Sequence, residues 1–150
     1  MALKLRSQMP ELDGATTWLN KEVSKNDLLG GKPTLFHFWS ISCGLCKEAM
    51  PSVNEFRELY KDQLHVVAVH MPRSEKDLDL EEIKTVAEEH GITQPIIVDN
   101  QHKITDAFEN EYVPAYYVFD EEGQLRHFQA GGGGMKMLTK RVNRVLGIKE

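Results

Sequence analysis

Short apolar runs alternate with amphipathic segments along most of this chain. The runs at residues 34–39, 64–70 and 95–99 are nearly continuous apolar or aromatic stretches, which is typical of strands covered on both faces. After Cys46 and again after Leu80, apolar residues recur at steps of three and four, and polar residues fill the other sides. This pattern predicts strand–helix–strand units, whose crossovers join parallel strands.

The last third of the chain predicts a hairpin and a final helix. Residues 115–120 and 124–129 flank a short turn, while residues 102–110 suit a short helix. From Met135 onward, apolar residues again recur at helical steps. Because no repeat or linker interrupts the pattern, and 150 residues suit one core, we expect a single domain over residues 1–150. The element order predicts an α/β fold in which helices flank a mixed central sheet.

Composition and charge argue against two classes of partner. The formal net charge is −5, and Lys and Arg form no basic stripe, so the attraction to phosphate that dominates nucleic-acid binding lacks a source. The N-terminal segment never sustains the apolar run of a signal peptide, and no later segment has the roughly 18 consecutive apolar residues of a membrane span. We therefore expect a cytoplasmic monomer that binds neither nucleic acid nor a membrane.

The two cysteines of the chain, Cys43 and Cys46, stand in the turn between the first apolar run and the helix that follows it. A C-x-x-C pair that opens a helix places one sulfur over unpaired backbone N–H groups and the positive end of the helix dipole, which favours the thiolate. We assign Cys43 as the nucleophile, with its sulfur expected near solvent, and Cys46, one turn into the helix, as the resolving thiol. In the cytosol such a pair is more often catalytic than a permanent cross-link.

A metal site is the alternative explanation for a C-x-x-C pair. A structural zinc site needs four ligands, and the chain contains neither a second C-x-x-C nor an H-x-x-x-H. We therefore expect no metal and no cofactor beyond a redox-active Cys43–Cys46 disulfide.

The element order, the Cys pair and a later Val113-Pro114 resemble the thioredoxin-like fold. The similarity is closer to the TlpA/ResA branch of thiol-disulfide oxidoreductases, and it lies in the segments Met9–Leu12, Lys32–Thr34 and Phe38–Trp39 and in the run from Cys43 to Pro51. That branch has an N-terminal extension and an insertion, which residues 72–99 would supply here. The chain departs from the branch at Ser42 and Leu45, where Trp and often Pro are usual, and at Ala49, where many members carry Glu.

The resemblance gives roles to further residues. It implies that Pro114 is cis and lies against the Cys pair, leaving the backbone of Val113 free to pair with an extended substrate; without it, Pro114 would be read as an ordinary trans proline before an edge strand. Trp39, Val113 and Pro114 would line the substrate-binding side of the active site, where Trp39 is expected mainly to pack and also to shield the thiolate. His37 stands where thioredoxin carries a buried acid, so it could relay a proton from Cys46. The alternative for His37, a core histidine satisfied by a neighbouring carbonyl, is favoured because buried polar groups usually find such partners.

The function predicted from these residues is that of a thiol-disulfide oxidoreductase. Its substrates would be protein disulfides, an upstream dithiol reductant would recycle it, and its role would be antioxidant thiol repair in the cytosol. A peroxide-reducing, peroxiredoxin-like enzyme is one alternative, although the chain lacks the P-x-x-x-T-x-x-C signature. A non-enzymatic Cu(I) carrier is another, although the related scaffold uses a wider cysteine spacing and a distal histidine.

Overall fold

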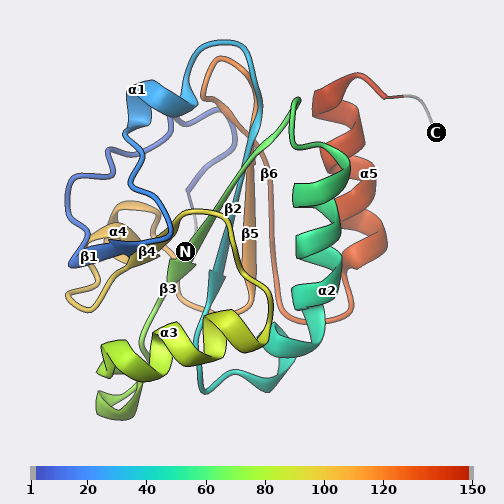
Figure 1. Cartoon of the computed structure of the whole chain (residues 1–150). Coiled ribbons are helices and arrows are strands. Elements are labelled where there is room, and N and C mark those ends of the chain that lie inside the picture. The colour runs from blue at the N-terminus through green and yellow to red at the C-terminus, as the bar shows by residue number, and fades with distance from the viewer. Residues whose placement is uncertain (1–2, 149–150) are drawn as a thin grey trace.

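A mixed six-stranded sheet forms the centre of the molecule in the computed structural model, which describes residues 3–148 (Figure 1). The strand order is β1-β4-β3-β2-β5-β6, in which β2 pairs in parallel with β3 and β3 with β4, while the other three pairings are antiparallel. The strands are β1 (Thr17–Leu19), β2 (Thr34–Trp39), β3 (His65–His70), β4 (Ile96–Val98), β5 (Ala115–Phe119) and β6 (Leu125–Ala130). The predicted mixed sheet is confirmed, including the parallel crossover that surrounds the cysteines.

Helices cover both faces of this sheet. They are α1 (Lys25–Leu28), α2 (Gly44–Leu59), α3 (Leu80–Glu89), α4 (Lys103–Ala107) and α5 (Met135–Leu146), with a 3-10 helix, η1, at Glu75–Leu78. Figure 1 shows α2 and α5 side by side on one face. Pro51 lies inside α2, whose ribbon changes direction along its first half (Figure 1). The expected insertion at residues 72–99 contributes η1, α3 and β4.

Two hydrophobic clusters fill the space between the sheet and the helices. Successive residues of a strand point to opposite faces, so Leu35 and Trp39 of β2 join the cluster under α2, α3 and α5, while Phe36 and Phe38 join the one beside α1 and α4. In the second cluster the ring of Phe108 packs edge-on against the ring of Phe36, with centroids 4.9 Å apart. Burial on both faces explains why β2 is a continuous apolar run.

The hydrophobic pattern did not predict β1 or α1. Strand β1 has only three residues, all half-buried, and its place is determined by antiparallel pairing with β4. Helix α1 is one turn long and is held by a capping box in which Ser24 and Asp27 exchange hydrogen bonds with each other's backbone. Residues 1–2, the start of the segment considered for a signal peptide, and residues 149–150, the end of the expected domain, lie outside the described part.

Candidate active site

The register of the central strands brings the cysteine loop next to Val113 and Pro114. Phe38 pairs with Ala115 of the antiparallel strand β5, so the loop that leaves β2 at Trp39 and the residues that lead into β5 lie at the same end of the sheet. The Val113–Pro114 peptide bond is cis. Backbone hydrogen bonds of the sheet, rather than side-chain contacts, therefore set this juxtaposition.

Cys43 is the N-cap residue of α2. Its backbone is extended, and its Sγ accepts a hydrogen bond from the backbone N–H of Cys46 at 3.1 Å. The two residues form a disulfide, with their Cα atoms 5.3 Å apart. The first turn of α2 contains no acidic residue that would oppose a negative charge on the sulfur. After reduction, the same N–H group and the positive end of the helix dipole would stabilise a thiolate at Cys43.

The expectation that the sulfur of Cys43 lies near solvent is wrong for this disulfide form. Cys43 is 3% exposed and Cys46 is 2% exposed, so exposure does not distinguish the two thiols. Both cysteines belong to the hydrophobic cluster that contains Trp39, and Val113 packs against that cluster. What distinguishes them is their place on the helix, because Cys43 caps it and Cys46 lies within its first turn.

Leu45, Val113 and residues 131–134 lie at the same end of the molecule as the cysteine pair, and we call them the active-site rim. Leu45 is 52% exposed, and a Cβ atom added to Gly132 would lie 3.2 Å from its Cδ2 atom, so this glycine segment lies directly against the leucine. The backbone N–H of Gly131 donates to the carbonyl of Pro114 at 2.8 Å. Within residues 3–148 the backbone of Val113 makes no hydrogen bond, which leaves it available to a partner strand.

Comparisons with known proteins agree with this geometry. The sequence profile of the AhpC/TSA family matches residues 5–128, which is most of the chain. The chain belongs to the AhpC/TSA family. It is 72% identical to the thiol-disulfide oxidoreductase YkuV of Bacillus subtilis (strain 168), over 99% of this chain and 100% of that protein. It is 30% identical to the thiol-disulfide oxidoreductase ResA of Geobacillus kaustophilus (strain HTA426), over 67% of this chain and 56% of that protein.

A solved structure extends the match to three dimensions. The solution structure of a thioredoxin-like protein in its oxidized form superposes with a TM-score of 0.90, at 72% identity, over 99% of this chain and all of that one. The thioredoxin-like fold predicted from the sequence is confirmed. This member of the AhpC/TSA family is a thiol-disulfide oxidoreductase with a C-x-x-C disulfide.

The side chain of His37 belongs to a hydrogen-bond network with Gln94 and Arg57. Within residues 3–148 no hydrogen bond joins it to a cysteine. The Nε2 atom of His37 lies 2.8 Å from Nε2 of Gln94, whose Oε1 accepts a hydrogen bond from Arg57 at 2.8 Å. Gln94 therefore donates to an unprotonated ring nitrogen. Burial, with a smaller effect from the Arg57 charge, lowers the pKa of His37 to about 3. Moving a proton to it from a thiol of ordinary pKa would cost roughly 7 kcal/mol, which favours a core histidine over a proton relay.

A polar cluster beside Cys43 was not predicted from the sequence. Ser42, Arg73 and Asp77 are joined by hydrogen bonds, and His70 lies at the adjacent end of β3, where its Nε2 accepts the backbone N–H of Ile41 at 3.1 Å. Burial lowers the pKa of His70 to about 4, against a smaller opposing effect of the Asp77 charge. The sequence alone does not predict this cluster, because no spacing rule links the segment that follows His70 to a cysteine about thirty positions earlier.

Trp39 packs as expected, with its ring edge-on to that of His70 at a centroid distance of 4.9 Å. It is 1% exposed, and its Nε1 atom has no hydrogen-bond partner within the described residues. The tryptophan therefore packs inside the molecule, in the same hydrophobic cluster as the two cysteines.

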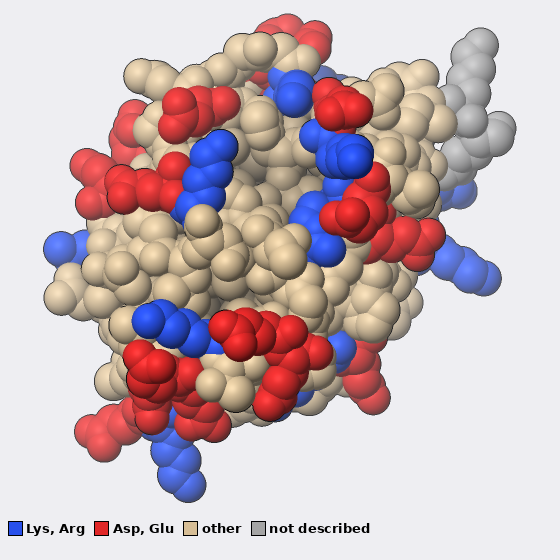
Figure 2. Space-filling model, viewed as in Figure 1, with Lys and Arg blue, Asp and Glu red and all other residues tan. Residues whose placement is uncertain are grey.

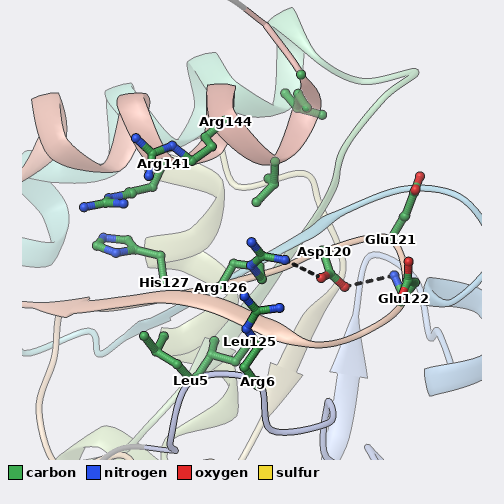
Figure 3. A pocket seen from close by; sticks show the side chains of 13 residues that line it. Leu5, Arg6, Asp120, Glu121, Glu122, Leu125, Arg126, His127, Arg141 and Arg144 are labelled. Carbon is green, nitrogen blue, oxygen red and sulfur yellow. Dashed lines mark hydrogen bonds and ion pairs between the residues drawn. The ribbon is translucent and has the colours of Figure 1, made fainter.

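A cavity of about 630 Å³ lies between α5 and the β5–β6 hairpin (Figure 3). The cavity includes the hairpin turn that follows Phe119. The cysteines lie at the other end of β5, near Ala115, so this cavity is separate from the active site. The arginines of the cavity share it with carboxylates, and Arg126 pairs with Asp120 at 3.3 Å. The charged residues that line it are Arg6, Asp120, Glu121, Glu122, Arg126, Arg141 and Arg144. Acidic and basic side chains are likewise interspersed on the face shown in Figure 2.

Residues 3–148 contain no group of three or more His, Cys, Asp or Glu side chains placed to hold a metal ion. In the same range, no helix is both long enough and apolar enough to cross a bilayer.

Proposed function

We propose that this oxidoreductase reduces disulfide bonds of other proteins in the cytosol, with Cys43 as the attacking thiol and Cys46 as the resolving thiol. The observation that carries the assignment is the position of Cys43 Sγ, which caps α2 and accepts the N–H of Cys46. A capping thiolate is stabilised by the helix, whereas a thiol within the first turn is not. The cytosolic thiol pool would return the pair to its dithiol form.

The reaction proceeds in two exchanges. The Cys43 thiolate attacks one sulfur of the substrate disulfide, so a Cys43–substrate bond forms and the second substrate sulfur leaves as a thiolate that takes a proton from water. Cys46 then loses its proton and attacks Cys43, which releases the first substrate sulfur and forms the Cys43–Cys46 disulfide. Two electrons pass to the substrate, and a dithiol reductant restores the enzyme by the reverse chemistry.

The substrate would enter as an extended segment over the active-site rim. The free backbone of Val113 offers an N–H and a carbonyl to such a segment, at the end of the sheet where Cys43 lies. Because Cys43 is nearly buried in the disulfide form, the residues packed around it must move before a reductant reaches its sulfur.

Single-cysteine variants test the assignment. We expect Cys43→Ser to abolish insulin reduction, and we expect Cys46→Ser to accumulate mixed disulfides that dithiothreitol releases. Non-reducing gels and mass spectrometry would detect those adducts, and Cys43→Ser in the same incubation is the control that should form none. Full insulin reduction by both variants would refute the two roles.

Two further assays separate the alternatives. Rapid turnover of hydrogen peroxide by the reduced protein, without a protein disulfide, would support a peroxiredoxin-like activity instead. Stoichiometric retention of Cu(I) against competing glutathione would support a copper carrier. We expect neither, because the chain lacks the P-x-x-x-T-x-x-C signature and its two cysteines stand closer together than those of the related copper-carrying scaffold.

A further inference from the structure

Arg73 is bonded to the residue that immediately precedes the attacking cysteine. Its Nη2 atom donates to the backbone carbonyl of Ser42 at 2.7 Å, and its Nη2 and Nε atoms lie 3.1 and 3.2 Å from Ser42 Oγ. Arg73 follows the end of β3 and stands about thirty positions after Ser42 in the chain. The guanidinium therefore connects the inserted segment to the cysteine loop at the peptide group that Cys43 shares with Ser42.

Asp77 holds both partners of this contact. One of its carboxylate oxygens, Oδ2, accepts the hydroxyl of Ser42 at 2.8 Å and the backbone N–H of Arg73 at 2.9 Å. Asp77 is 1% exposed, and its other oxygen is buried without a hydrogen-bond partner within the described residues. A buried carboxylate with these donors fixes the backbone from which Arg73 projects.

The hydroxyl of Ser42 is what makes the arrangement possible. It donates to Asp77 and accepts from Arg73 at the same time, which an indole N–H cannot do because it is only a donor.

We propose that Arg73 is a positioning residue that holds a permanent positive charge beside the Cys43 sulfur and so increases the fraction of Cys43 present as thiolate. This inference rests on the proposed role of Cys43. The carbonyl that the guanidinium binds belongs to the residue before the helix cap, so its charge adds to the positive end of the α2 dipole. The ionisable groups on the elements around the pair include Lys47 and Glu48 of α2, His70 of β3, Arg73, Glu75, Lys76, Asp77 and Asp79 after β3, and Glu82 of α3.

The negative charge of Asp77 opposes this effect, since its Oδ2 accepts the hydroxyl of the same Ser42 that the guanidinium contacts. Asp77 stays in place when Arg73 is replaced, so the comparison of an Arg73 variant with the parent isolates the charge of the guanidinium. Arg73 is also exposed, so its replacement removes a charge without opening the core.

The test measures how the alkylation rate of Cys43 by iodoacetamide depends on pH. In a Cys46→Ser background, which leaves Cys43 as the single thiol, Arg73→Gln should raise the pH midpoint by about 0.5 to 1. At pH values below the midpoint this corresponds to a roughly 3- to 10-fold lower rate. Arg73→Lys should restore most of the midpoint because it keeps the charge. Arg144→Gln is the matched control, since it removes an exposed arginine at the far end of α5 and should leave the midpoint unchanged.

An Arg73→Gln midpoint equal to that of the parent would overturn the inference. So would an Arg73→Lys midpoint as high as that of Arg73→Gln, because the effect would then not depend on charge. Either result leaves the proposed function standing if Cys43→Ser is inactive and Cys46→Ser traps substrates. Insulin reduction by Cys43→Ser would instead refute the proposed function, whatever the Arg73 variants show.

Discussion

Replacing His37 by Leu should make the protein less sensitive to acid. In the folded protein burial lowers the pKa of His37 to about 3, whereas an unfolded histidine titrates near 6.5. Below pH 6.5 the unfolded chain therefore binds a proton at this residue that the folded chain does not bind. Because unfolding then takes up a proton, the free energy of unfolding falls as the pH falls from about 6.5 toward 3.

The size of the effect follows from those two values. At pH 4.5 the unfolded His37 is almost fully protonated and the folded one is neutral, which destabilises the fold by about 2.6 kcal/mol relative to pH 7.5. Any folded pKa of about 4 or lower gives nearly the same figure. His70, whose folded pKa is about 4, has the same sign and a similar size. The two histidines together remove about 5 kcal/mol, a large part of the stability of an ordinary domain.

Urea unfolding at pH 7.5 and pH 4.5 measures this difference. The loss of stability between the two pH values should be smaller by about 2 to 3 kcal/mol in His37→Leu than in the parent. The variant should also be less stable at pH 7.5, by about 1 to 3 kcal/mol, because the amide of Gln94 loses its acceptor. The control Ile96→Val should cost about 1 kcal/mol at both pH values and leave the loss unchanged. If the free energy of unfolding fell equally in His37→Leu and in the parent between the two pH values, His37 would not be neutral in the folded protein.

Two further predictions concern stability. Asp99→Ala should cost about 3 kcal/mol in urea unfolding, since the buried carboxylate accepts the backbone N–H groups of Ile104 and Thr105 at 3.0 and 2.7 Å, and a cost below about 1 kcal/mol would show that water replaces it. Gly131→Ala should cost at least about 1 kcal/mol because φ is +92° there. Gly132→Ala should cost less than about 0.5 kcal/mol because its neighbour Leu45 is an exposed, flexible side chain. Equal thermal shifts in the two glycine variants would contradict this distinction.

The central part of the fold could be predicted from the sequence because its signals are local. Strand β2 is an apolar run buried on both faces, and α2 follows it with apolar residues at helical steps, so the cysteines fall between them. Strand β1 carries no such signal, since three half-buried residues have no period to detect. It exists because the edge of β4 pairs with it, which is a property of the assembled sheet.

The candidate site was predictable in its covalent chemistry and not in its surroundings. The C-x-x-C spacing alone indicates where the disulfide lies on α2, and the N-cap contact to Cys43 follows from helix geometry. The low exposure of Cys43 depends on tertiary packing, since Val113, which packs against the cluster that contains it, stands about seventy positions further along the chain. The bond between Arg73 and Ser42 joins two polar loops, and polar loops have no hydrophobic period from which such a pairing could be inferred.

The pairing of Phe38 with Ala115 also sets how much the chain can change in length near the site. Adding or removing a residue in the hairpin turn after Phe119 alters a loop at the distant end of the sheet and leaves the reacting groups where they are. Losing one residue between Trp39 and Cys43 would instead draw the start of α2 toward the sheet and rotate the sulfur away from the peptide group of Val113. We therefore expect length variation among working versions of this protein to concentrate at the hairpin and to be absent from the short stretch that carries the cysteines.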